Sequence, residues 1–205
     1  MNRKSTRRAV LCSLTGLLAG CSDYSAEDPD AEDETQTPSP PPETVPAVGD
    51  TTEITRDEVL RLQRLVVEET NAQREEMGLA PLTYHDGLSQ VARYRGYDMW
   101  SRDYFGHDDP EGRYHPYYIK KFGYDCTIPS AENLFGGFYH PDKSLRENAQ
   151  SMVESWMGSS AHRSAILNKE HNIIGVGVFV FNHDEGGTGA YALQLFCPEV
   201  SSTDE

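Results

Sequence analysis

The composition of the first fifty residues is unsuited to a hydrophobic core, so we expect folding to be confined to the residues after them. Residues 9–19 form an uncharged apolar run of 11 residues behind four basic residues. A bilayer-spanning helix takes about 20 residues, whereas a basic start and a short apolar run are typical of an export signal. Residues 22–50 hold nine acidic residues, no basic one and a proline cluster at 38–42, too little apolar surface to offset the entropy of ordering.

These compositions predict four segments. A signal occupies residues 1–20, a disordered acidic and proline-rich spacer residues 21–50, a folded domain residues 51–200 and a short tail residues 201–205. The domain has about 150 residues, a normal length for one substantial core.

The leader also predicts where the protein works. Its Arg7-Arg8 pair resembles a twin-arginine signal, which exports proteins after folding. Residues 18–21, Leu-Ala-Gly-Cys, resemble a lipobox, in which Cys21 becomes a lipid-modified N-terminus. Together these features predict an extracellular, cell-surface lipoprotein anchored to the cytoplasmic membrane through Cys21, with the acidic spacer as an extended stalk. The alternative is an ordinary cleaved signal with an unrelated cysteine at position 21.

The net charge of the chain indicates which classes of partner it can bind. The chain carries −15, and the domain alone about −10 once the four basic leader residues and nine acidic spacer residues are set aside. Nucleic acid is excluded as a partner because a phosphate backbone requires a basic stripe. Acidic residues spread over the surface, with five lysines against thirteen arginines, predict a halophilic protein such as one from a haloarchaeon. An acidic surface protein from ordinary salt is the alternative.

Two cysteines, Cys126 and Cys197, fall in the domain. An oxidising exterior permits a disulfide, and two cysteines allow only one pairing. A pair of buried free thiols is the other possibility.

Helical patterns precede strand patterns along the domain. Thr55 and Glu58 have capping-box spacing, and apolar residues follow at helical spacing up to Gly78, namely Val59, Leu62, Leu65, Val66 and Met77. Further helices are expected over 86–102, 117–122 and 144–157.

Strands are expected over 133–135, 173–181 and 190–196, the last two joined as an antiparallel hairpin. In 173–181 the β-branched residues face one way, and Gly175 and Gly177 face the other, which leaves room for close packing. Helices first and a hairpin last indicate an α+β fold with helices packed on a mostly antiparallel sheet.

Three short stretches contain the residues that could carry chemistry. Residues 104–112 contain His107, residues 131–135 contain Glu132, and residues 154–163 contain Glu154, Ser159 and His162. Each stretch alone is compatible with ordinary loop or capping residues, and no compact metal motif such as His-Glu-x-x-His joins them.

Their order and spacing resemble the CAP superfamily, the SCP-like domain of cysteine-rich secretory, antigen 5 and pathogenesis-related proteins, in its bacterial and archaeal form. The resemblance runs from about Leu62 to Cys197, and its further matches are Asn71-Ala72-Gln73-Arg74, 78–82, Glu132-Asn133-Leu134, Trp156-Met157, 160–168 and 174–178. It implies a three-layer α-β-α sandwich with a mostly antiparallel central sheet. It also implies a central cleft that gathers two histidines and acidic side chains.

Carried over by position, the resemblance assigns His107 and His162 as the histidines and Glu132 as the carboxylate. Ser159 stands where animal members have a second glutamate, and Glu154 lies on a different side of its helix. Ala131 and Ala161 replace the usual glycines.

Such a set permits two interpretations of function. Two imidazoles and a carboxylate suit zinc, and a zinc-dependent hydrolase or peptidase would use Glu132 or metal-bound water to activate the nucleophile. In a metal-free cleft, Glu132 would instead hold both histidines by charge-assisted hydrogen bonds.

Members of the superfamily are associated with lipid and sterol binding, protein interaction and, rarely, proteolysis. We expect a binding module for a lipid, peptide or cell-envelope ligand rather than an enzyme; a surface protein without a ligand is the third possibility.

Overall fold

The computed structural model describes residues 45–51, 53–184 and 186–203. The export signal, Cys21 and spacer residues 22–44 lie outside this described part of the chain. The elements in chain order are α1 (Arg56–Glu76), β1 (Thr83–Tyr84), α2 (Asp86–Ser101), α3 (His115–Lys121), β2 (Tyr124–Cys126), β3 (Ala131–Tyr139), α4 (Leu145–Gly158), α5 (Ser160–Ile166), β4 (Ile173–Asn182), β5 (Thr188–Cys197) and β6 (Val200–Ser202).

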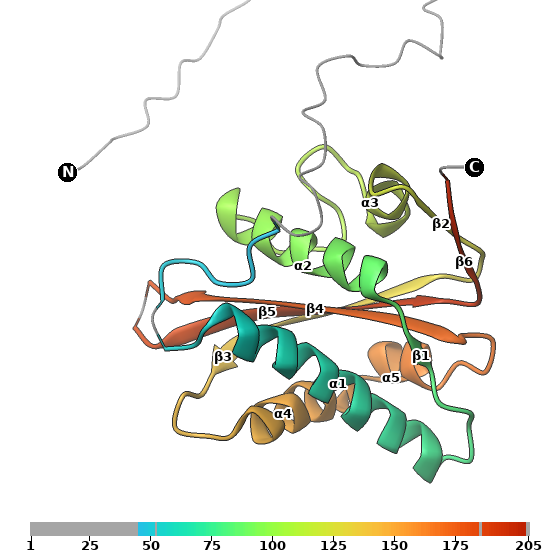
Figure 1. Ribbon diagram of the computed structural model, residues 1–205, viewed down its shortest axis with the longest axis horizontal. Helices are drawn as coiled ribbons and strands as arrows, with labels where there is room; N and C mark the ends of the chain where they lie inside the picture. The colour runs from blue at the N-terminus through green and yellow to red at the C-terminus, as the bar shows by residue number, and fades with distance from the viewer. Residues whose placement is uncertain (1–44, 52, 185, 204–205) are drawn as a thin grey trace, which may run out of the picture. The chain divides into compact units, whose positions relative to one another are not determined.

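A four-stranded sheet forms the middle layer, in the order β1-β4-β5-β3. Strands β3, β4 and β5 are antiparallel to their neighbours, and short β1 runs parallel to β4. Helices α1, α4 and α5 lie on one face of the sheet and α2 and α3 on the other, as Figure 1 shows. The predicted α+β sandwich with a mostly antiparallel sheet is confirmed, and β3 is an edge strand of that sheet.

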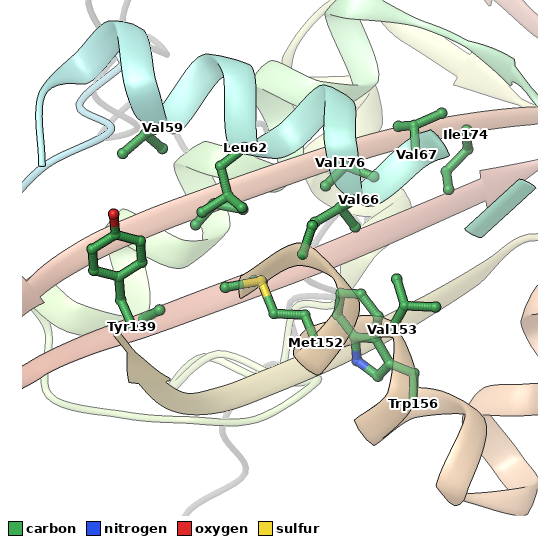
Figure 2. Packing of buried hydrophobic residues seen from close by; sticks show 14 of the residues in the cluster. Val59, Leu62, Val66, Val67, Tyr139, Met152, Val153, Trp156, Ile174 and Val176 are labelled. Atoms are coloured by element: carbon green, nitrogen blue, oxygen red, sulfur yellow. The ribbon is translucent and has the colours of Figure 1, made fainter. Parts of the chain in front are cut away.

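The larger core lies between the sheet and the α1–α4 pair (Figure 2). Helix α1 begins at the predicted capping box, where the Thr55 side chain accepts from the backbone N–H of Glu58 and the Glu58 carboxylate accepts from that of Thr55. Val59, Leu62 and Val66 of α1 are fully buried against α4 and β4. The assignment of Met77 to this apolar face was wrong, because Met77 caps the helix and is 62% exposed.

The glycine face of β4 lets helix α2 approach the sheet closely. A Cβ atom at Gly175 would lie 2.4 Å from Cβ of Leu88, and one at Gly177 would lie 2.0 Å from the backbone nitrogen of Arg93. The opposite face of β4 sends Ile174, Val176, Val178 and Val180 into the larger core. The predicted division of this strand into a glycine face and a β-branched face is confirmed.

Gly177→Ala is expected to lower the free energy of unfolding by about 3 kcal/mol, because the backbone of α2 has to move away from the new methyl group. Gly158→Ala is the control, since no atom lies within 4 Å of a Cβ at that position, and it should be neutral or slightly stabilising. Urea denaturation of both variants measures the difference. Equal midpoints would contradict the close packing of α2 on β4.

The folded region differs from the predicted boundaries at both ends. Val45 and Ala47 are buried, and Val48 pairs in parallel with Val180, so the last residues of the expected spacer pack on the domain. At the other end, Val200–Ser202 pairs with Tyr124–Cys126 as a second small sheet and extends into the expected tail. The strand expected at 133–135 is the middle of the nine-residue β3.

A disulfide joins Cys126 at the end of β2 to Cys197 at the end of β5. The bridge therefore ties the small β2–β6 sheet to the central sheet. Its two cysteines are 71 residues apart in the sequence. Over the residues that the structure describes, none of the helices combines the length and the apolar character needed to span a bilayer.

Candidate functional site

Glu132 on edge strand β3 is buried beside helix α2. Its side chain is 1% exposed, and strand alternation places it on the same face as Leu134, which packs in the core on the α2 side. A carboxylate buried to this extent requires charged or hydrogen-bonding partners. Those partners come from α2 and from the loop that follows it.

Arg95 of α2 is the principal partner of Glu132. Its side chain is fully buried, and its Nε atom lies 3.4 Å from Oε2 of Glu132. Its Nη2 atom donates to the carbonyls of Gly106 and His107 at 3.1 and 2.7 Å, and its Nη1 atom donates to the Tyr104 hydroxyl at 2.9 Å. Burial acts to lower the pKa of Arg95, but the charge and hydrogen bond of Glu132 raise it on balance. The guanidinium of Arg95 on helix α2 therefore contacts both the loop 104–107 and strand β3.

His107 completes what we call the edge cluster: Arg95, His107 and Glu132. The Nδ1 atom of His107 lies 3.0 Å from Oε1 of Glu132, and its side chain is 55% exposed. The hydrogen bond to Glu132 raises the pKa of His107 above its ordinary value despite opposing desolvation. His107 is thus the solvent-facing member of the cluster.

The loop that carries His107 is fixed at its far end by buried Asp109. The Asp109 carboxylate accepts from the backbone N–H groups of Glu111 and Arg113 at 2.9 Å and from Nε of Arg113 at 2.7 Å. It also accepts from the Tyr118 hydroxyl. Burial raises the pKa of Asp109, but these donors outweigh it and hold the pKa below its usual range. These hydrogen bonds to Asp109 therefore hold in place the loop that carries the imidazole of His107.

His162 reaches the same neighbourhood from the other face of the sheet. Its carbonyl accepts from Nδ2 of Asn133 at 3.1 Å, and this amide also donates to Oε1 of Gln194 at 2.9 Å. Burial, and then the positive charge of His107, lower the pKa of His162. The charge of His107 thus acts on His162 although 55 positions separate them. Ser159 is half-buried between α4 and α5, and Glu154 is exposed on α4.

The sequence analysis did not identify two residues that lie near Glu132 and His107. Arg95 lies on the apolar stripe of α2 with Val91 and Met99, and a charged residue on such a stripe is a signal that could have been followed. His115, the first residue of α3, places Nε2 3.1 Å from the Ser130 hydroxyl oxygen. Burial lowers the pKa of His115, and the charges of Glu132, Arg95 and His107 act on it. No local sequence pattern signals this position.

Glu132 is not available as a direct ligand for a zinc ion. Oε1 of Glu132 faces His107 and Oε2 faces the guanidinium of Arg95, whose positive charge opposes a cation at the same carboxylate. Within the described ranges, no three His, Cys, Asp or Glu side chains are grouped so that they could hold a metal ion. Among the described residues, His107, His162 and Glu132 are therefore not grouped as three direct ligands of one ion.

An aromatic pocket is lined in part by Phe105, which precedes His107 of the edge cluster by two residues. It encloses about 270 Å³ and is lined by Phe105, Gly136, Gly137, Phe138, Phe181, His183 and Tyr191. Phe105 packs over Gly136, where a Cβ would lie 2.9 Å from the ring, and its ring centroid is 5.2 Å from that of Tyr191. Phe105 remains 51% exposed. The loop 104–107 therefore presents an apolar ring and an imidazole two residues apart.

Fold and site together define a three-layer α-β-α domain with a buried charged cluster at an open sheet edge. Residues 67–196, more than half of the chain, match the model of the cysteine-rich secretory protein (CAP) family. The chain belongs to this family.

Two curated relatives come from Bacillus subtilis. The uncharacterized protein YkwD is 36% identical over 115 residues, which are 56% of this chain and 41% of YkwD. The uncharacterized membrane protein YlbC is 28% identical over 119 residues, which are 57% of this chain and 31% of YlbC. The chain thus spans less than half the length of either relative.

Solved structures show the same fold. An extracellular protein containing a SCP domain from Bacillus anthracis has a TM-score of 0.56 at 21% identity, covering 71% of this chain and 44% of that one. An outer surface protein from Borrelia burgdorferi has a TM-score of 0.52 at 18% identity, covering 67% of this chain and 92% of that one. These similarities support the fold alone.

The three histidines should titrate in a fixed order. His107 is expected to titrate above the ordinary value of about 6.5, and His115 and His162 below it. The His107–Glu132 contribution to stability is therefore fully present below about pH 6.5 and is lost as pH rises through the raised pKa. Burial of His115 and His162 has the opposite sign and costs stability as pH falls below about 6.5. Imidazole NMR titration measures the order, and a pKa of His107 below that of His162 would contradict the geometry.

Proposed function

We propose that this protein is a cell-surface binding module whose edge cluster and aromatic pocket hold a ligand without transforming it. The observation that carries the proposal is the engagement of both Glu132 oxygens, by His107 and by Arg95. A carboxylate held in this way positions His107 and is not free to act as a general base. A metal-dependent hydrolase would need that carboxylate released, and no observation here favours one.

The chemistry of the surface indicates the class of ligand. Phe105 and the pocket beside it suit an apolar group, and the half-exposed imidazole of His107, whose pKa the Glu132 hydrogen bond raises, suits a carboxylate or another anionic acceptor when it is protonated. Lipids, peptides and cell-envelope fragments combine these two features. Recognition would then consist of apolar burial in the pocket and one charge-assisted hydrogen bond from protonated His107.

Native mass spectrometry of the full chain purified from its source cells tests binding against turnover. We expect a retained ligand of unaltered mass that is lost in Phe105→Ala and His107→Ala. The exposed imidazole of His140 lies outside the cluster, so His140→Ala serves as control and should retain the ligand. The same ligand in all variants, or cleaved products in place of it, would contradict the proposal.

The tether is proposed on the leader and spacer, which lie outside the described residues. Arg7-Arg8, the Leu-Ala-Gly-Cys run and the acidic spacer support export followed by lipid attachment at Cys21. Cys21→Ser should move the protein from the membrane fraction to the medium, and an unchanged membrane fraction would refute the anchor.

The acidic composition supports a halophilic habitat. The domain charge of about −10 is screened over ~3 Å at 1 M salt but over ~30 Å at 0.01 M. The melting temperature should therefore fall as salt is removed, and a flat profile would contradict the proposal.

A further inference from the structure

The outer edge of the central sheet is covered along one part of strand β3 and open along another. Among the described strands, β3 ends the order β1-β4-β5-β3. Near its start the edge is covered, because Nε1 of Trp156 donates to the carbonyl of Leu134 at 2.9 Å. Further along the same strand, Gly136 and Phe138 are exposed. We call residues 136–138 the open edge.

The register of the sheet determines which way the backbone groups of β3 point. In an antiparallel ladder, residue pairs that exchange hydrogen bonds alternate with pairs that do not. The N–H group of His183 donates to the carbonyl of Gly187 at 3.0 Å, so the odd-numbered residues of β5 bond to β4 and the even-numbered ones bond to β3. Ala190 is one of the even-numbered residues, and its partner in β3 is Gly137. Gly137 therefore directs its backbone groups into the sheet.

Gly136 and Phe138 consequently direct their N–H and C=O groups away from the sheet. The hydrogen bond from Trp156 agrees with this assignment, because Leu134 is also even-numbered and its carbonyl is reached from outside the sheet. Exposed sheet edges are usually blocked by a charged residue, a proline or a bulge, and residues 136–138 contain neither a charge nor a proline. Two donors and two acceptors are thus available to an extended chain.

The aromatic pocket lies on the face to which side chains of an added strand would point. Gly136 follows Leu134 by two residues, so both lie on the face that α2 covers. The ring of Phe105 packs over Gly136 on this face. In an antiparallel pair, directly opposed residues project their side chains to the same face. A residue opposite Gly136 therefore places its side chain beside Phe105, where the pocket of about 270 Å³ can take one large apolar group.

On the basis of the binding function proposed above, we propose that the open edge binds an extended peptide as an added antiparallel strand. One large apolar side chain of this peptide occupies the aromatic pocket. An extended peptide supplies the alternating N–H and C=O groups that the edge requires, whereas a lipid tail supplies neither.

The antiparallel direction follows from two features. Antiparallel pairing is slightly more stable per residue than parallel pairing. It also points the carboxyl end of the peptide towards the start of β3, where His107 contacts Glu132. Protonated His107 then attracts the carboxylate of the peptide.

Two isomeric peptides test the strand pairing with the full chain. The probe is acetyl-Thr-Val-Thr-Phe-Thr-Val-Thr with a free carboxylate, and its phenylalanine exchanges both N–H···O bonds with Gly136 in the proposed register. N-methylation of that phenylalanine removes a bond to the edge and is expected to weaken binding about tenfold or more. N-methylation of the preceding threonine is the matched control, because that N–H points away from the sheet. It should change the affinity by less than about twofold.

Amide hydrogen exchange gives a second readout that needs no variant of the protein. The N–H groups of Gly136 and Phe138 should exchange rapidly in the free protein and about tenfold or more slowly with saturating probe, whereas that of Gly137 is protected throughout.

Three results would overturn the proposal. One is equal affinity for the two methylated peptides, and another is no binding of the unmodified probe at millimolar concentration. Either result would leave the binding function standing wherever native mass spectrometry still shows a retained ligand that depends on Phe105. The third is protection of the open edge that appears on concentrating the protein without probe, which would assign this edge to a second copy of the chain.

Discussion

Arg95→Met is expected to lower the free energy of unfolding by about 3–5 kcal/mol, because it leaves the Glu132 carboxylate buried without its guanidinium. Both side chains are at most 1% exposed, so solvent screening does not reduce the effect. The melting temperature of a domain of this size should fall by roughly 10 °C. Thermal unfolding of the full chain measures the change.

Two further variants separate the lost ion pair from lost packing. Arg95→Met combined with Glu132→Leu should recover part of the stability, since an apolar pair replaces a stranded charge. Arg146→Met is the matched control, because Arg146 pairs with Glu68 and Glu69 on the surface and is 49% exposed. It should leave the midpoint nearly unchanged. Equal losses at positions 95 and 146 would refute the role given to Arg95.

Replacing Cys126 and Cys197 together with serine is expected to cost about 4 kcal/mol, because the bridge closes a loop across a sequence separation of 71 residues. Reduction of the unmodified chain should give the same loss, which provides an internal control. Two thiols that react with a thiol reagent in the folded, unreduced chain would show that the bridge is absent. That outcome would restore the free-thiol alternative left open by the sequence.

Local signals in the sequence explain which parts of the fold were predictable. Helix α1 was predictable because Thr55 and Glu58 satisfy its first N–H groups from within the segment. Strand β4 was predictable because Gly175 and Gly177 alternate with β-branched residues. The packing of Val45 was not, because it depends on contacts outside its own segment: the Val45 carbonyl accepts from Arg56 of α1, and nearby Val48 pairs with Val180, more than 130 residues away.

The same distinction applies to the site. His107, Glu132 and His162 were identified through the family resemblance, and the structure places His107 against Glu132 and leaves His162 as a neighbour that acts through charge. The position of Arg95 on the apolar stripe of α2 indicated a buried charge, but its partners could not be assigned from sequence because its four acceptors come from a loop and from another strand. Its position limits what Glu132 can do, since the guanidinium faces one of the two carboxylate oxygens.

The account rests on Glu132 being bound by Arg95 and His107 rather than free for a metal. The most direct test is a zinc titration of the full chain near neutral pH, followed through the imidazole ¹⁵N resonances of His107 and His162. We predict that both histidines stay at their metal-free positions at stoichiometric zinc and that Glu132→Gln changes nothing in this response. Saturable, simultaneous shifts of both histidines at one zinc per chain, abolished by Glu132→Gln, would contradict the account.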